Sequence, residues 1–227
     1  MGIAQDKAGV TAAVEDYAKA IYELEAREGG AVSTNALAER LDVTPASASA
    51  MVKKLSALAL VSHVPYRGVR LTAKGRRVAL EVLRHHRLLE LYLAESLGVP
   101  WDKVHEEAEV LEHVLSEELE ELIAAKLANP TRDPHGDPIP TRDGRIEEPT
   151  TVSLASLDAG ATGTLVRISD SDPEMLRYLS DRDIAIGAAF EVVEKQPFDG
   201  PLLVRFGSAV HALGGKLAGA IRVEALR

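Results

Sequence analysis

The sequence predicts a mainly α-helical protein with a small β domain, arranged as a winged helix-turn-helix, a helical middle domain and an SH3-like barrel. Three observations predict this fold class. Apolar residues recur at helical spacing through most of residues 13–127, prolines and glycines crowd residues 129–149, and short apolar runs punctuated by glycines fill residues 151–227. We therefore expect domains at residues 1–75, 76–148 and 149–227.

Composition narrows the class of protein further. No apolar run approaches the roughly 20 residues of a membrane span. The polar residues 1–9 lack the apolar core of a secretory signal. The chain has no Cys, which excludes disulfides, thiolate metal ligands and Cys nucleophiles. We expect a cytoplasmic protein with no membrane partner.

Three helices are predicted at the start of the chain, and the second and third form a helix-turn-helix. Residues 13–26 are amphipathic and are followed by a Gly-Gly pair that ends the helix, and Ser33 can cap a short second helix. Thr44 has the character of an N-cap, with Pro45 at the first position of a third helix that runs to about residue 58. The side chains expected to face the core are Val14, Tyr17, Ile21, Leu24, Leu37, Ala38, Leu41, Ala48, Val52, Leu55 and Ala59.

Basic residues concentrate in this part of the chain. Residues 1–77 hold 11 Lys and Arg against 8 Asp and Glu, whereas the remainder holds 15 against 27. No acidic residue occurs between Val43 and Leu80. A basic segment within an acidic protein indicates a local contact with a polyanion, because such a cluster can neutralise phosphates. The helix-turn-helix makes double-stranded DNA the expected partner.

The third helix and the hairpin after it are the expected DNA-binding elements. Residues 60–71 contain two short apolar runs around a Gly-containing turn, which predicts a wing with Arg67 at its tip. Thr72 can cap the next helix, which runs to about Leu97. In this arrangement the start of the third helix enters the major groove and its lysines lie nearer the phosphates. The predicted contacts are Thr44, Pro45, Ala46, Ser47, Ser49, Ala50, Lys53, Lys54 and Arg67.

The middle domain carries imidazoles and carboxylates at helical spacing. His86 and Glu90 are four residues apart and share a helix face. A second group, at steps of four, three and one, is His105, Glu109, Glu112 and His113. Such a set, without thiolates, suits a first-row divalent metal of borderline to hard character. A solvated Glu-rich face is the alternative; the apolar stripe beside the set favours a metal site and comprises Val104, Ala108, Leu111, Leu115 and Leu119.

Five segments between Val14 and the C-terminus resemble the diphtheria-toxin-repressor family of metal-activated transcriptional repressors. They are YAKAIYELE, AERLDVTPASASAMVKKL, YRGVRLTAKG, HRLLE and VHEEAEVLEHVLS. The resemblance implies a homodimer that binds palindromic operators of metal-homeostasis genes, a helical dimerisation domain, and an SH3-like third domain of the FeoA type found in ferrous-transport accessory proteins. It implies no enzymatic activity and no small-molecule substrate.

By the same resemblance, the primary metal site uses Asp16, Glu109, Glu112 and His113. The iron branch of the family has Met and Cys at the first two of these positions, so this chain resembles the manganese branch. Two soft sulfur donors favour Fe²⁺, Co²⁺ or Ni²⁺, whereas carboxylates suit Mn²⁺. The expected cofactor is Mn²⁺, with Fe²⁺ as the alternative and with Co²⁺, Ni²⁺, Zn²⁺ or Cd²⁺ as substitutes in vitro. In one version of the manganese branch, which binds a pair of metal ions, an acidic residue occupies the position of Lys19. This chain differs from that version at this position.

Three-domain members also have an ancillary metal site, and the sequence leaves two ligand sets open. One set comprises His86, Glu90 and His105, and the other joins Glu90 to Asp133 and His135 of the Pro-rich segment. Asp172 is the carboxylate expected from the third domain, and its alternative role is the N-cap of the helix that begins at Pro173.

The sequence of the last domain, residues 149–227, predicts short strands and one helix. The strands are expected at residues 164–169, 190–194, 202–206 and 220–224, and the helix at residues 173–180. Their short length and glycine punctuation favour a small barrel.

Two other classes of protein fit parts of the sequence. A metalloenzyme would use open coordination positions on the His and Glu set, although no HExxH, nucleophile elbow or phosphate loop is present. A constitutive DNA-binding protein would keep the same set as a structural cluster. The dependence of DNA binding on metal distinguishes the three classes.

Overall fold

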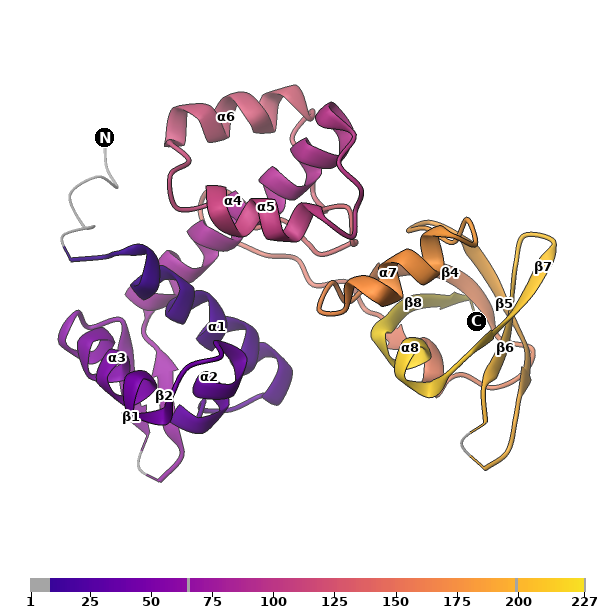
Figure 1. Cartoon of the computed structure of the whole chain (residues 1–227), viewed down its shortest axis with the longest axis horizontal. Helices are drawn as coiled ribbons and strands as arrows, with labels where there is room; N and C mark the ends of the chain where they lie inside the picture. Colours follow the sequence, from indigo (N-terminus) through magenta and orange to yellow (C-terminus); the bar gives the residue numbers. More distant parts are fainter. Residues whose placement is uncertain (1–8, 65, 199, 227) are drawn as a thin grey trace. The chain divides into compact units, whose positions relative to one another are not determined.

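The computed structural model describes residues 9–64, 66–198 and 200–226 (Figure 1). The chain forms two compact units, which divide within one long helix. The first comprises Met1–His85, Glu112–Leu115 and Pro140–Arg145, and the second comprises His86–Leu111, Ser116–Ile139 and Ile146–Arg227.

The first unit is built from three helices, a hairpin and the start of a fourth helix, which Figure 1 labels. These elements are α1 (Ala12–Glu28), α2 (Thr34–Arg40), α3 (Pro45–Ala57), β1 (Val61–Val64), β2 (Gly68–Leu71) and α4 (Ala73–Leu97). The hairpin pairs Val61 with Leu71 and Val64 with Gly68. A helix-turn-helix followed by a two-stranded wing is therefore confirmed, with Arg67 exposed in the turn between the strands.

Local capping explains where these helices begin and end. Gly29 adopts the left-handed conformation after α1, where its N–H bonds the Glu25 carbonyl. The hydroxyls of Ser33 and Thr44 accept hydrogen bonds from backbone N–H groups at the starts of α2 and α3. Thr72 accepts in the same way from Gly75 N at the start of α4. Each predicted N-cap is confirmed.

The predicted core of the first unit is correct at most positions. Its fully buried side chains include Ile21, Leu37 and Leu55. Ala59 is exposed, contrary to the prediction, because α3 ends at Ala57 and Ala59 has a φ of 56° in the turn that leads into β1. Val52 and Leu41 are half-buried.

The helical part of the second unit contains the end of α4, α5 (Val104–Leu111) and α6 (Glu117–Lys126). The expected apolar stripe does not continue along one helix, because α5 ends at Leu111 and the Ser116 hydroxyl caps α6. Val104 and Ala108 are buried as predicted, whereas Leu111 and Leu119 are 37% and 48% exposed. Glu112 and His113 therefore lie in the turn after α5 and not on the helix itself.

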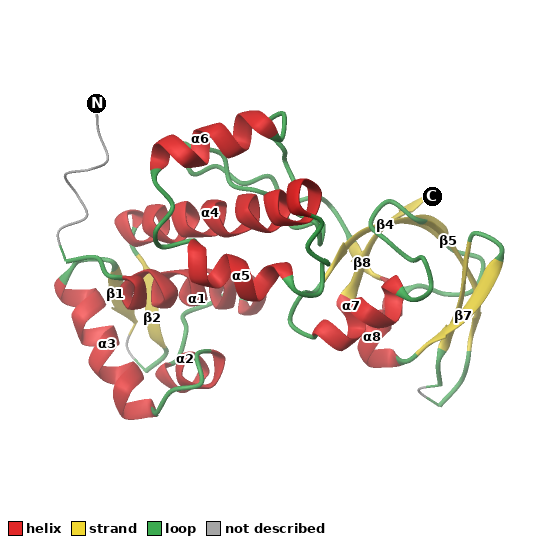
Figure 2. Cartoon of the chain, turned by 45° about the horizontal axis from the view of Figure 1, so that its top comes forward, coloured by secondary structure: helices red, strands yellow, loops and turns green. Residues whose placement is uncertain are grey.

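The C-terminal part of the second unit is a six-stranded antiparallel sheet in the order β3-β8-β4-β5-β6-β7. Its elements are β3 (Val152–Ser153), η2 (Leu154–Ser156), β4 (Thr162–Ile168), α7 (Pro173–Ser180), β5 (Ala189–Lys195), β6 (Leu202–Phe206), β7 (Ala209–Leu213), α8 (Gly215–Ala220) and β8 (Ile221–Leu226). Figure 2 labels β4, β5, β7 and β8 of this sheet and the helices α7 and α8. Four strands and α7 match the predicted segments. The sequence analysis missed β3, β7 and α8, since β3 has two residues, β7 is mostly exposed and α8 contains two glycines.

The Pro-rich segment lies against β4 within the second unit. Ile168 N donates to the His135 carbonyl at 2.9 Å. Gly136 has a φ of 86°, and a Cβ on it would lie 2.0 Å from the Val166 carbonyl oxygen. Only glycine permits this close backbone approach. The contact places the residues that follow β4 beside the Pro-rich segment.

Among the helices that the structure describes, none is long and apolar enough to cross a membrane.

Candidate metal centres

A first cluster of metal-binding side chains lies in the first unit and comprises Asp16, Glu112 and His113. Asp16 lies on the first turn and a half of α1, and the other two lie in the turn after α5. His113 Nε2 lies 2.8 Å from Asp16 Oδ1 and 3.5 Å from Glu112 Oε1. One donor atom from each residue lies within 4.8 Å of the others. Two carboxylates and an imidazole from segments almost 100 residues apart in the chain therefore converge.

Two neighbours of the first cluster were not predicted to take part. Glu15 Oε2 lies 2.7 Å from His113 Nδ1, which must be the donor if the carboxylate is ionised. In a metal-bound form this hydrogen bond would hold the proton on Nδ1 and leave Nε2, which faces Asp16, to bind the ion. Lys19, also on α1, places its ammonium 2.6 and 2.9 Å from the two oxygens of Glu112.

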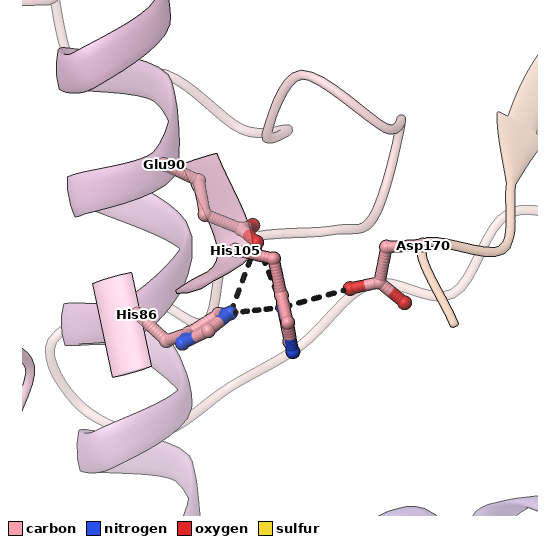
Figure 3. Close-up of side chains that lie close together, drawn as sticks. All are labelled: His86, Glu90, His105 and Asp170. Atoms are coloured by element: carbon pink, nitrogen blue, oxygen red, sulfur yellow. Dashed lines mark hydrogen bonds and ion pairs between the residues drawn. The ribbon is translucent and has the colours of Figure 1, made fainter. Parts of the chain in front are cut away.

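A second cluster lies in the second unit and comprises His86, Glu90, His105 and Asp170. His86 and Glu90 come from adjacent turns of α4, His105 from α5, and Asp170 from the segment after β4 (Figure 3). Glu90 Oε1 lies 3.0 Å from His86 Nε2 and 3.2 Å from His105 Nδ1. His105 Nδ1 lies 3.1 Å from His86 Nε2 and 3.3 Å from Asp170 Oδ2.

The separations in the second cluster match those of metal ligands. An ion with ligand bonds of about 2.1 Å holds its ligand atoms roughly 3.0–3.4 Å apart in octahedral or tetrahedral geometry. Two imidazole nitrogens and two carboxylate oxygens lie close together at such spacings, and His86 and Glu90 are buried. The donor set fits Mn²⁺, Fe²⁺, Co²⁺ or Zn²⁺ better than a soft metal.

Electrostatics in the second cluster show how strongly its groups interact. Hydrogen bonds with Asp170 and then Glu90 raise the pKa of His105 to about 10, although burial opposes the shift. Burial would raise the pKa of Glu90, but the histidines around it lower that pKa well below its ordinary value. At neutral pH the His105 imidazole is therefore protonated on both nitrogens and positively charged, and a metal that binds it must displace one of these protons.

A third cluster shares Glu90 and adds Asp133 and His135 of the Pro-rich segment. His135 Nε2 lies 2.7 Å from the Trp101 carbonyl, so this nitrogen is the donor and Nδ1 faces Glu90 Oε2 at 3.8 Å. Burial opposes protonation of His135, but Glu90 and Asp133 raise its pKa to about 9. Burial together with the charges of Asp137 and Glu90 raises the pKa of Asp133 to about 8.

Asp133 also has a structural function in the Pro-rich segment. Its Oδ1 accepts hydrogen bonds from His135 N and Asp137 N, both at 2.9 Å. Its Oδ2 lies 3.6 Å from Arg87 Nε. One oxygen thus organises the turn, and only the other faces a charged side chain. The two ancillary sets left open by the sequence are in fact adjacent, and Glu90 belongs to both.

The residues predicted to contact DNA are all exposed on the first unit. They lie at the start and outer face of α3 and in the turn of the hairpin. Ala48 and Leu55, on the opposite face of α3, are buried. The predicted surface is therefore available on the side of α3 that faces away from the core.

Comparison with known proteins covers nearly the whole chain. Family models match residues 10–69 (iron dependent repressor, N-terminal DNA binding domain), 72–141 (iron dependent repressor, metal binding and dimerisation domain) and 152–225 (FeoA domain). The iron-dependent repressor IdeR of Mycobacterium bovis is 34% identical over 92% of this chain and 96% of its own length. The chain belongs to the iron-dependent repressor family.

Two further relatives show the breadth of this repressor family. The diphtheria toxin repressor of Corynebacterium diphtheriae is 31% identical over 93% of this chain and 96% of its own length. A solved structure described as a manganese-dependent transcriptional repressor in complex with manganese is 44% identical, has a TM-score of 0.87, and covers 94% of this chain and 100% of its own. The family consists of transcriptional repressors, so the metalloenzyme alternative is excluded.

The structure groups the predicted ligands of this repressor differently from the sequence analysis at two positions. Among the residues that the structure describes, Asp172 joins no cluster: it caps α7 through Glu174 N, and its other oxygen lies 2.9 Å from Lys216 Nζ. The third-domain carboxylate that reaches the histidines is Asp170. Glu109 lies in the second unit, 3.8 Å from His86 Nδ1 and 3.7 Å from His105 Nε2.

Proposed function

We propose that this chain is a manganese-activated transcriptional repressor that acts in the cytoplasm as a homodimer on palindromic operator DNA. Residues 1–75 would bind DNA, residues 76–148 would dimerise and bind metal, and residues 149–227 would form the FeoA-type domain. The observation that carries the proposal is the composition of the first cluster. Asp16, Glu112 and His113 offer hard oxygen and imidazole donors, and the chain has no Cys at all.

The proposed activating site is the first cluster completed by Glu109. The ion would supply a positive charge that joins carboxylates which otherwise repel one another and repel DNA. Asp16 belongs to α1, which packs against the helix-turn-helix, and His113 belongs to the turn after α5. Ligation by both would favour the conformation in which the two recognition helices of a dimer enter successive major grooves, about 34 Å apart.

DNA binding measured with and without metal tests the proposal. In a titration of operator DNA by fluorescence anisotropy, Mn²⁺ at micromolar free concentration should raise the affinity by about 100-fold, and a chelator should reverse the effect. Equal binding in both conditions would indicate a constitutive DNA-binding protein. A response to Fe²⁺ with none to Mn²⁺ would place this repressor in the iron branch.

The second cluster is the proposed ancillary site, with Asp170 as its ligand from the third domain. Asp170→Asn should remove one bound metal per chain, measured by elemental analysis after dialysis, and should reduce DNA affinity only a few-fold. Asp172→Asn is the matched control, since Asp172 lies two residues away and pairs with Lys216. We expect it to keep the metal. Loss of metal in Asp172→Asn and not in Asp170→Asn would reverse the assignment.

Trp101 provides an independent readout for the same variants. It is the only Trp in the chain, and its ring stacks on that of His135 with centroids 6.0 Å apart. Metal binding to Glu90 should change the charge of His135 and hence the Trp fluorescence. The change should saturate with Mn²⁺ in the wild type and in Asp172→Asn, and should weaken in Asp170→Asn.

The proposed DNA surface makes a prediction about salt dependence. Lys53 and Lys54 on α3 and Arg67 in the wing are exposed and are proposed to contact phosphates. Each Ala substitution should weaken binding to all sequences and reduce the slope of log affinity against log salt by about one. Lys126→Ala, at an exposed position of α6, is the control and should leave the slope unchanged. Unchanged slopes in all three variants would show that the DNA-binding surface lies elsewhere on the protein.

A further inference from the structure

Lys19 is a charged side chain buried beside the first cluster. Its side chain is 7% exposed and that of Glu112 is 0% exposed. The ammonium contacts both carboxylate oxygens, Oε1 at 2.6 Å and Oε2 at 2.9 Å. A buried carboxylate needs such a partner, because an unpaired charge in the interior is strongly unfavourable.

The ammonium contacts the same atoms that a metal would use. Glu112 Oε1 is the oxygen that lies 3.5 Å from His113 Nε2, on the side of Asp16. Lys19 is three residues after Asp16 on α1, so both residues project from the same helix face. One helix therefore supplies a metal ligand and, one turn later, a cation that pairs with another ligand of the same site.

We propose that Lys19 is an internal cation that competes with the divalent metal for Glu112, and so raises the metal concentration at which the repressor is activated. The inference rests on the proposed function, in which the first cluster is the activating site. A metal that binds Glu112 must displace at least one of the two hydrogen bonds and must tolerate a like charge nearby. The ammonium also satisfies Glu112 before metal arrives, which keeps α1 and residues 112–113 together in the metal-free protein.

A purely structural role for the Lys19–Glu112 ion pair predicts the opposite change in metal affinity. If Lys19 served only to orient Glu112 for the metal, removing it would weaken metal binding, because misplaced ligands lose about 10- to 100-fold in affinity. If Lys19 competes, removing its charge strengthens metal binding. The direction of the change therefore distinguishes the two roles.

The test is calorimetric titration of Mn²⁺ into chelator-treated, full-length Lys19→Met. Met keeps the length and the apolar stem of the side chain without the charge. We expect Mn²⁺ to bind the first cluster at least tenfold more tightly than in the wild type, and the metal-free protein to unfold at a lower temperature. Saturating Mn²⁺ should restore that temperature to the wild-type value. Lys126→Met is the matched control and should behave as the wild type in both measurements.

Two additional variants secure the interpretation. Lys19→Gln retains an N–H donor for Glu112 without the charge, so it should fold even if Met does not, and it should also bind Mn²⁺ more tightly. Adding His113→Ala to either variant should abolish the tightened phase and thus assign it to the first cluster. Unchanged or weaker Mn²⁺ binding in both Lys19 variants would overturn the inference. Because the readout is metal binding, that result would leave manganese-dependent DNA binding by the wild type, and with it the proposed function, intact.

Discussion

His113→Ala is expected to abolish most of the manganese activation of DNA binding. At the Mn²⁺ concentration that saturates the wild-type protein, the operator affinity of the variant should be about 100-fold lower. His113 supplies the nitrogen donor of the first cluster, 2.8 Å from Asp16 and 3.5 Å from Glu112. Without it, the remaining carboxylates repel one another and the ion loses the donor that joins α1 to the turn after α5. Fluorescence anisotropy with labelled operator DNA, at graded free Mn²⁺, measures the effect.

Two further variants accompany this experiment, one as a control and one that weakens a contact of His113. His211→Ala removes a half-buried imidazole from β7, far in sequence from the clusters, and should leave activation unchanged. Glu15→Gln keeps His113 but weakens the charge-assisted hydrogen bond to its Nδ1, and should reduce Mn²⁺ affinity by roughly 10-fold. If His113→Ala still responded to Mn²⁺ like the wild type, the first cluster would not be the activating site.

The winged helix-turn-helix could be predicted from the sequence because its determinants are local. Ser33, Thr44 and Thr72 cap helices through backbone groups three residues away, so short-range chemistry determines where each helix begins. The end of α5 was harder to predict, because helical spacing continues past Leu111 into Glu112 and Leu115. Ser116 was the local signal for the break, since its hydroxyl caps the next helix.

The site could be predicted only in part, because its members come from distant segments. His86 and Glu90 share a helix face, and spacing alone brings them together. The choice between Asp170 and Asp172 depends on how the backbone leaves β4, which Gly136 and the close approach to Val166 determine. Glu15 resembled an ordinary polar position of α1, and Lys19 was notable only because a paired-metal version of the family has an acid there. Their contacts with His113 and Glu112 join residues more than 90 apart, and no local pattern records such contacts.

The double variant Asp16→Met with Glu109→Cys should change which metal activates the repressor. A thioether and a thiolate are soft donors that favour Fe²⁺, Co²⁺ or Ni²⁺, whereas two carboxylates suit Mn²⁺. We expect at least about a tenfold higher Mn²⁺ concentration for half-maximal DNA binding, and a lower one for Co²⁺ and Ni²⁺, measured anaerobically by anisotropy. The Asp172→Asn protein is the control and should keep the wild-type order of metals. An unchanged order in the double variant would exclude these two residues as the source of selectivity.

The single variants of this pair separate the two clusters that Glu109 could serve. Asp16 belongs only to the first cluster, so Asp16→Met should alter DNA activation and leave the manganese-dependent Trp101 fluorescence unchanged. Glu109 is proposed to complete the first cluster, yet its carboxylate lies 3.7 Å from His105 Nε2 and 3.8 Å from His86 Nδ1. If Glu109→Cys reproduces Asp16→Met in both measurements, Glu109 ligates the activating metal. If it changes the fluorescence and leaves activation intact, Glu109 serves the ancillary site, because the thiolate would then act on the histidines of the second cluster.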